Sequence, residues 1–318
     1  MGKKDIHTKL LTRNNDVFAE LFNTFLFNED IVDPKRLKEK DTAEIAAILN
    51  KMHVIQKYRD VIRYAEIKND DHLTYLLLGL ENQTHISTVM PVRVMLYDAL
   101  SYSDQISGYR KKMREDGKTY TGIEWLSGLP QEQKIAPVIT LVLCWSPDQW
   151  NSPKCLYDMI DRPTLDRFGK YINDYKLNLV SVYDVSDETL RSLKTEIGLA
   201  LEFSKYSKNK EKIIEFANDD RFRKVSKEFV ETISVMTDTK IKVNEDGGYV
   251  NMCEGIRLLQ EEAKIQGIAE GKTEGIAEGK IIILNEMVRD GDISERRAAE
   301  KANMSEEEFR KQYMNYSF

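Results

Sequence analysis

The chain has 318 residues, of which 41% are hydrophobic and 31% are charged, and its formal net charge is −6. The length favours about two domains, and the apolar content is sufficient for a folded core. The longest apolar run, Ile135 to Trp145, is shorter than the roughly 18 residues that span a bilayer, so no membrane partner is expected. The N-terminus has no apolar stretch typical of a secretory signal, and the three cysteines show no CxxC spacing. These features disfavour a disulfide framework and a zinc knuckle, and we expect a cytoplasmic protein.

The charge is distributed unevenly along the chain. Residues 1–145 carry 20 basic and 20 acidic side chains, whereas residues 146–318 carry 27 and 33. The net charge therefore gives no general argument for a polyanionic partner. A surface for nucleic acid would have to be a local patch, and the first part of the chain is the better place for it.

The first predicted element is a helix over residues 14–27, because its apolar residues recur at helical spacing and Asn14 or Asn15 can cap it. Residues 28–40 are predicted to form a loop. A second helix is expected over residues 42–52, with Thr42 as a possible cap.

The period then changes to that of strands. Residues 60–67 and 72–83 flank the polar sequence Asn-Asp-Asp, which predicts a β-hairpin. The apolar run from Tyr75 to Leu80 is typical of a central strand buried on both faces. A long helix follows over residues 88–113, and its end is basic.

Two further strands are predicted over residues 135–144 and 177–183, and strands separated by a long helix indicate a mixed α/β sheet. After residue 187 the pattern is helical. The helices expected there span residues 187–205, 208–217 and 221–237. A linker is expected after them, over residues 238–250.

The tail contains a local repeat, GIAEGKTEGIAEGK, over residues 267–280, in which glycine recurs at every fourth position. Each glycine weakens a helix by about 0.5–1 kcal/mol relative to alanine. The stripe can let a second helix approach closely, which allows a homo-oligomer, or it can be a flexible spacer. Residues 281–313 are predicted to form a small helical unit, in which Ser294 and Ser305 cap helices and Ser305 forms a capping box with Glu308.

Common catalytic constellations are absent from the sequence: it has no P-loop, no HExxH and no GxSxG, and its four histidines are not at ligand spacing. The candidate site therefore consists of carboxylates. In a hairpin with its turn at residues 69–71, Asp60 is expected opposite Glu81, and Gln83 shares the face of Glu81. Two such carboxylates can share a divalent cation, and oxygen ligands suit Mg²⁺ or Mn²⁺. The alternative is that Glu81 marks where the strand meets solvent.

Arg93 and Tyr97 are four residues apart on the helix that follows. Arg93 could bind a phosphate group, or it could form a salt bridge with a nearby carboxylate. The basic residues at the end of the same helix are further candidates for DNA binding: Arg110, Lys111, Lys112 and Arg114.

The blocks YRDVIRYAE, YLLLGLENQTHISTVMPVRVMLYDALSY and IAPVITLVLCW occur together and in order. With them, the chain from Asn14 through the Gly/Glu-rich tail resembles the Rpn family of recombination-promoting nucleases, also described as PD-(D/E)XK nuclease family transposases. The resemblance implies a restriction-endonuclease-like core, in which helices flank a mixed sheet, and metal-dependent cleavage of DNA phosphodiesters in recombination or mobile-element processes.

The resemblance also implies roles for individual residues. Asp60 matches the first metal-binding Asp, and Glu81 matches the acidic residue of the (D/E)XK pair. Gln83 stands where the superfamily has Lys, although Glu-x-Gln is a usual form in this family. Because Gln cannot supply a positive charge or take up a proton, activity could be slow. Glu20 on the opening helix matches the position of an additional acidic metal ligand, and its alternative role is a solvent-facing Glu.

The predicted organisation is a PD-(D/E)XK nuclease-like core over residues 1–185, followed by a helical subdomain over 186–237 that completes it. Residues 238–280 form the linker and Gly/Glu-rich repeat, and residues 281–318 form the C-terminal unit. Two alternatives to an active endonuclease remain. One is a nuclease-fold protein without activity that binds DNA or a protein. The other is a regulator that reads DNA through residues 294–313, although acidic side chains there offset the basic ones.

Overall fold

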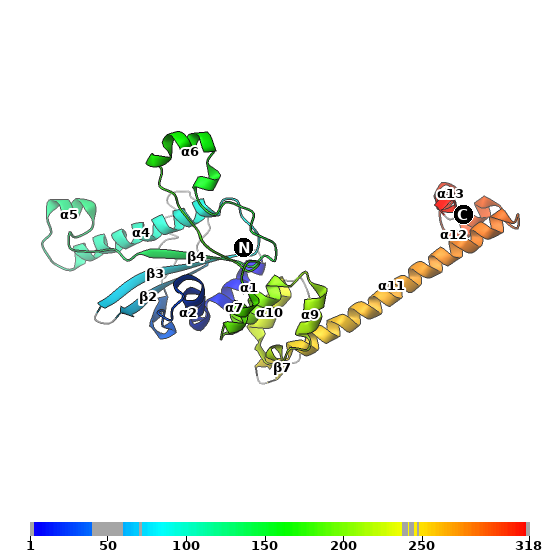
Figure 1. The fold of residues 1–318 in the computed structure, drawn as a ribbon, viewed down its shortest axis with the longest axis horizontal. Coiled ribbons are helices and arrows are strands. Elements are labelled where there is room, and N and C mark those ends of the chain that lie inside the picture. The colour runs from blue at the N-terminus through cyan, green and yellow to red at the C-terminus, as the bar shows by residue number, and fades with distance from the viewer. Residues whose placement is uncertain are drawn as a thin grey trace. The chain divides into compact units, whose positions relative to one another are not determined.

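The computed structural model describes residues 3–39, 60–69, 72–236, 241, 245–246 and 248–315. Its contacts divide the chain into two compact units, Met1–Gly255 and Ile256–Phe318. The chain is α/β, with a five-stranded mixed sheet flanked by helices and a helical C-terminal region (Figure 1). Within the described residues, no helix combines the length and the apolar character that crossing a bilayer requires.

The N-terminal helices are α1 (Lys3–Thr12) and α2 (Asn15–Phe22), and a π-helical turn, η1 (Asn23–Phe27), extends α2. The side chain of Asn14 caps α2, which confirms the predicted helix start. The helix ends because Asn28 adopts the left-handed conformation, with φ 51°, which Asn tolerates better than most residues. The sequence analysis did not predict α1.

The sheet has the order β1-β2-β3-β4-β5. The pairs β1–β2 and β2–β3 are antiparallel, whereas β3–β4 and β4–β5 are parallel. The five strands are β1 (Leu37–Glu39), β2 (Val61–Asn69), β3 (His72–Gln83), β4 (Val138–Cys144) and β5 (Asn178–Ser181). The loop predicted over residues 28–40 is therefore wrong at its end, where η2 (Pro34–Arg36) leads into β1.

The register of the predicted hairpin is confirmed. Val61 pairs with Leu80, so that Asp60, the residue before β2, lies at the position opposite Glu81. Leu77, Leu78 and Leu80 are fully buried, as expected for a central strand. The helix predicted over 42–52 and two residues of the predicted turn, 70 and 71, lie outside the described residues.

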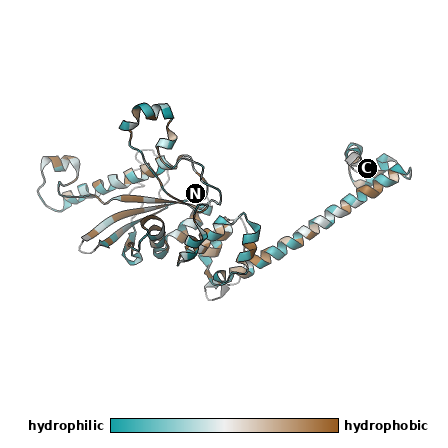
Figure 2. Ribbon diagram, in the orientation of Figure 1, coloured by the Kyte–Doolittle hydropathy of each residue, from teal (hydrophilic) through white to brown (hydrophobic). Residues whose placement is uncertain are grey.

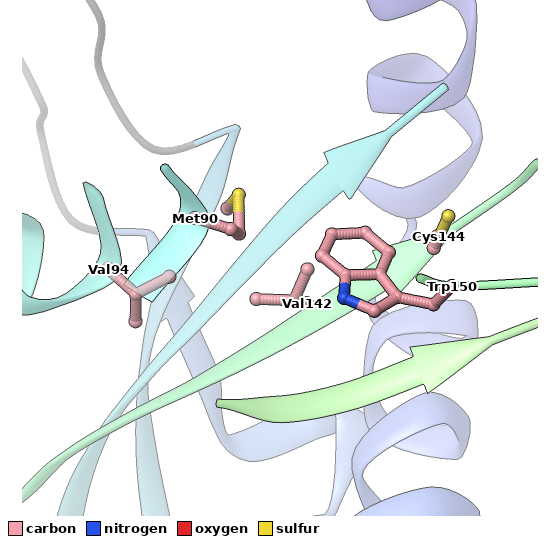
Figure 3. Close-up of a cluster of buried hydrophobic side chains, with 5 residues drawn as sticks. All are labelled: Met90, Val94, Val142, Cys144 and Trp150. Atoms are coloured by element: carbon pink, nitrogen blue, oxygen red, sulfur yellow. The ribbon is translucent and has the colours of Figure 1, made fainter. Parts of the chain in front are cut away.

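Helix α4 (Met90–Glu115) confirms the long predicted helix and connects the parallel strands β3 and β4. Its residues Met90 and Val94 pack against Val142 and Cys144 of β4 and against Trp150 (Figure 3). The hydrophobic colour along β3 and β4 in Figure 2 marks this buried centre. Helices α1 and α2 lie at the opposite face, since α1 hydrogen-bonds Asn82 of β3 and α2 hydrogen-bonds Arg63 of β2.

Short elements occupy the connections on either side of β4. They are α5 (Gly122–Ser127), η3 (Tyr157–Met159), α6 (Arg162–Phe168) and η4 (Gly169–Tyr171). The capping box of α5, formed by Thr121 and Glu124, stabilises a helix that is otherwise exposed.

The single helix predicted over residues 187–205 is wrong, because two helices occupy this range, α7 (Asp187–Ser192) and α8 (Glu196–Lys205). The Glu20 carboxylate accepts hydrogen bonds from the backbone N–H groups of Lys194 and Thr195 and so fixes the break between them. After α9 (Lys210–Phe216) come η5 (Asp220–Phe222), the short strand β6 (Val225–Ser226) and α10 (Lys227–Met236). The helix predicted over 221–237 therefore begins later.

The predicted linker over residues 238–250 contains two short strands among its described residues. β7 (Glu245–Asp246) and β8 (Tyr249–Val250) form a small antiparallel sheet with β6, in the order β6-β8-β7. This small sheet belongs to the first unit.

The second unit contains most of α11 (Met252–Arg289), together with α12 (Glu295–Ala302) and α13 (Glu306–Asn315). The Gly/Glu-rich repeat is helical and lies within α11. The side chain of Ser294 caps α12, and Ser305 and Glu308 bond each other's backbone N–H groups, so both predicted caps are confirmed. A small core forms around Leu284, Ala298, Ala299 and Phe309.

Candidate functional site

The two predicted carboxylates lie just before the start of β2 and near the end of β3, and both are buried. Asp60 is 9% exposed and Glu81 is 2% exposed. The backbone N–H of Asn82, the residue after Glu81, donates a hydrogen bond of 2.8 Å to Oδ2 of Asp60. The hairpin register thus places Asp60 beside the end of β3, as the sequence predicts.

Glu81, Gln83 and Arg93 form a closed set of polar contacts. The Arg93 guanidinium donates through Nη2 to Oε1 of Glu81 and through Nη1, at 3.2 Å, to Oε1 of Gln83. The Gln83 amide in turn donates to Oε1 of Glu81 at 3.2 Å. The residue that could bind phosphate is therefore paired with a carboxylate, which is the alternative that the sequence left open.

Tyr97 lies one helical turn after Arg93 and is 7% exposed. Burial, and then the negative charge of Glu81, raise the pKa of Tyr97, whereas the Arg93 guanidinium opposes this shift. The phenol therefore stays protonated at neutral pH and can donate a hydrogen bond within the site.

Asn82 is a site residue that the sequence analysis missed. Its side chain faces away from Glu81, because neighbouring strand residues point to opposite faces. Its Nδ2 donates to Oγ1 of Thr12 at 2.9 Å, and its Oδ1 accepts from Nε1 of Trp145 at 3.0 Å. The signal that could have found Asn82 is a polar residue at the end of an apolar strand, between two candidate site residues.

Glu20 contributes to a different part of the fold. Both of its carboxylate oxygens accept hydrogen bonds from residues 194 and 195, and the Thr195 hydroxyl donates one of 2.6 Å. Among the described residues, no group of three or more His, Cys, Asp or Glu side chains is arranged to hold a metal ion. The structure thus does not bring Glu20 into a metal cluster with Asp60 and Glu81.

The predicted basic cluster lies at the far end of α4. From Arg93 to Arg110 the helix rises about 25 Å, at about 1.5 Å per residue. Arg110 donates to the backbone carbonyl of Ser127, whereas Lys111 and Lys112 line a groove. This cluster and Arg93 therefore cannot contact the same phosphate group.

The donor chemistry of the site fits a hard divalent cation. Asp60 and Glu81 supply carboxylate oxygens, and Gln83 supplies an amide oxygen, which are the ligand types that Mg²⁺ and Mn²⁺ accept. Since Arg93 already pairs with Glu81, a cation held by the two carboxylates would share Glu81 with the guanidinium.

Comparison of the chain with family models, with curated proteins and with solved structures found no match.

Proposed function

We propose that the chain is a divalent-metal-dependent DNA endonuclease of the Rpn type, with a restriction-endonuclease-like core. The observation that carries the proposal is the group of Asp60, Glu81, Gln83, Arg93 and Tyr97 where β3 ends and α4 begins. The antiparallel β1–β2–β3 part of the sheet and the parallel crossover to β4 also support it, because the resembled family implies a mixed sheet flanked by helices.

In this proposal Asp60 and Glu81 hold Mg²⁺ or Mn²⁺, which when bound supplies the positive charge that activates water and stabilises the charge that builds on the phosphate. The water oxygen forms a bond to phosphorus while one P–O ester bond breaks, and one water proton ends on the leaving oxygen, so that the products are a phosphomonoester and a hydroxyl. Gln83 orients the water or a phosphate oxygen through its amide.

Arg93 supplies a second positive charge in the proposed reaction. Gln83 cannot carry charge, whereas the Arg93 guanidinium is always charged and already bonds both Glu81 and Gln83. It is therefore the cation next to the carboxylates, and it can bind the phosphate of DNA bidentately once it leaves Glu81.

The test is plasmid nicking by the purified chain in Mg²⁺, in Mn²⁺ and in EDTA, beside the double variant Asp60→Asn/Glu81→Gln. We expect nicking that needs a divalent cation and is lost in the double variant. The matched control is Asp166→Asn/Glu211→Gln, which removes two carboxylates at exposed positions away from the site. Nicking that survives in Asp60→Asn/Glu81→Gln would refute the proposal.

The second candidate is a nuclease-fold protein that binds DNA or a protein without cleaving. The observation that favours it is the pairing of Glu81 with Arg93 and Gln83, in which groups of the chain itself already donate to Oε1 of the carboxylate. Folded protein that binds DNA but does not nick it in either cation would support this candidate.

A further inference from the structure

A groove of about 1120 Å³ lies between the distal part of the β2–β3 hairpin and the second half of α4. Tyr64 and Tyr75 line it from the sheet, and Gly108 and Tyr109 line it from the helix. The segment before β4, residues 133–137, forms its third wall. The groove is separate from the carboxylates, because Tyr75 lies six residues before Glu81 on β3, about 20 Å at about 3.3 Å per residue.

The groove exists because the chain before β4 is hydrogen-bonded to α4. The Ala136 N–H donates to Oε1 of Gln105 at 2.8 Å, and the Ala136 carbonyl accepts from Nε2 of Gln105 at 3.0 Å. Pairing between β3 and β4 therefore begins only at Leu77. The earlier β3 residues Leu73 and Tyr75 remain 49% and 50% exposed beside this opening.

The charged lining of the groove is mainly positive. Lys111, Lys112 and Lys134 are exposed, and none of them has an ion-pair partner among the residues that the structure describes. Of the two acidic lining residues, Glu39 pairs with Arg63 at 3.3 Å. The lining thus holds three lysines and two carboxylates, one of which is paired with Arg63, and this excess of positive charge favours an anionic ligand.

Aromatic rings accompany these lysines. Tyr64, Tyr75 and Tyr109 all line the groove, and half of Tyr75 is exposed. Lysines that follow a phosphate backbone, together with rings on which bases stack, are the features of a single-strand binding groove. Bases within a duplex already stack on each other and leave no face for such a ring. We propose that this groove binds single-stranded DNA.

The groove also suggests the substrate class of the site at the other end of β3, and this extension rests on the proposed nuclease function. A DNA molecule whose single strand lies in the groove would bring an adjoining segment to Asp60 and Glu81. The preferred substrate is then a duplex with a single-stranded flap or gap, and intact duplex is cut more slowly.

Binding of a fluorescein-labelled oligo-dT to the full chain tests the groove itself, with a duplex of equal length as competitor. We expect the single strand to bind more tightly. Replacing Lys111, Lys112 and Lys134 by Gln should lower the slope of log affinity against log salt by about 2, since each phosphate contact contributes about 0.7 for single strands. Tyr75→Ala should weaken binding about tenfold through the loss of one stacked base.

Gly108→Leu blocks the groove without disturbing the core, because a Cβ at Gly108 would meet no atom within 4 Å and its φ is not positive. Gly122→Leu is the matched control, since Gly122 is equally open and does not line the groove. Weaker oligo-dT binding by Gly108→Leu, with Gly122→Leu unchanged, supports the proposal.

Three results would overturn the proposal. The first is that Gly108→Leu binds oligo-dT as tightly as the wild type, and the second is that duplex binds as tightly as oligo-dT. The third is that Tyr75→Ala leaves oligo-dT binding unchanged and polyglutamate displaces the oligonucleotide. The last result would assign the groove to an acidic peptide instead. The variant Asp60→Asn/Glu81→Gln must still bind oligo-dT, so a failed nuclease proposal is distinguishable from a failed groove. If nicking occurs, flap DNA should be cut faster than duplex, and Gly108→Leu should remove that advantage.

Discussion

The ion pair between Arg93 and Glu81 stabilises the buried carboxylate of the candidate site. Glu81 is 2% exposed, and a carboxylate at that depth is stable as an anion only with a counter-charge or hydrogen bonds. Arg93 supplies the charge, and Gln83 adds a hydrogen bond to the same oxygen. In the proposed enzyme, a divalent cation would take over the role of the guanidinium at this carboxylate.

Arg93→Met is expected to lower the free energy of unfolding by about 3 kcal/mol. This value is near the lower end of the losses that follow removal of one partner of a buried ion pair. The lower end applies because 23% of the Arg93 side chain is exposed. Urea denaturation measures the change. The double variant Arg93→Met/Glu81→Gln is the control and should recover most of the loss, because no unpaired charge remains buried.

Mg²⁺ should stabilise Arg93→Met more than it stabilises the wild type. In the variant the cation no longer competes with the guanidinium, and a ligand that binds only the folded state raises stability by mass action. The melting temperature as a function of Mg²⁺ concentration reports this difference. An equal response of both proteins would show that the guanidinium and the cation do not compete for Glu81.

The Tyr97 phenol offers a test that needs no activity. The negative charge of Glu81 contributes to its raised pKa, so Glu81→Gln should lower that pKa towards the ordinary value. Because the folded-state pKa is raised, the stability that Tyr97 contributes is present below its unfolded pKa and is lost as pH rises through the folded one. Absorbance titration at alkaline pH, with Tyr97→Phe identifying the step, measures the shift.

At the scale of elements, the end of β3 is fixed by Asn82. Its amide contacts Thr12 of α1 and Trp145, the residue after β4, and its backbone N–H donates to Asp60. One residue therefore orients the carboxylate that precedes β2, while its side chain joins Thr12 and Trp145 on the other face of the sheet.

Asn82→Ala is expected to lower the free energy of unfolding by about 2–3 kcal/mol, because it leaves the buried Trp145 N–H without an acceptor. Asn178→Ala is the control. It removes an amide at an exposed position, whose Nδ2 donates to the backbone carbonyl of Thr140, and should cost under about 1 kcal/mol. Similar losses in the two variants would mean that Asn82 is not the anchor of β3.

The sequence correctly predicted the elements that depend on a local pattern of residues. The hairpin register followed from two apolar runs around a polar turn, and helix α4 followed from its apolar stripe. β1 was missed because its three residues carry one buried side chain, Leu37, and depend on pairing with β2. The break between α7 and α8 was missed because Glu20, which fixes it, is 175 positions away from Thr195.

In the candidate site, too, spacing predicted some contacts, whereas others depend on residues far apart in the sequence. Spacing alone predicted that Asp60 lies opposite Glu81 and that Gln83 shares its face. The ion pair of Arg93 with Glu81 needed the geometry of the β3–α4 turn, and the role of Asn82 needed partners 70 and 63 positions away. Spacing along one strand carries no information on such distant contacts.

At the scale of the whole molecule, α11 combines a repeat of weak helix formers with a continuous helical conformation. Gly267, Gly271, Gly275 and Gly279 recur along it, and a Cβ at each would meet no atom within 4 Å. Nothing in the surroundings that the structure describes for these four positions therefore requires glycine.

Replacing these four glycines by alanine should stabilise α11 by about 0.5–1 kcal/mol at each position. Circular dichroism and resistance to trypsin measure the gain. Gly291→Ala is the control with the opposite sign, because Gly291 has φ 84°, a conformation that alanine adopts only with strain.

The same substitutions test whether a second copy of the chain packs on the glycine stripe. If it does, the added methyl groups should weaken the oligomer, which sedimentation measures. An unchanged oligomeric state would contradict that predicted association.

Helix α4 has a further consequence as a rigid spacer. It begins beside the carboxylates and reaches the groove about 25 Å later along its axis, at about 1.5 Å per residue. A rod of fixed length between a strand-binding groove and a cleavage site acts as a ruler. The proposed enzyme would then choose its cut by distance from the junction between single and double strand, and the bases around the cut would matter little.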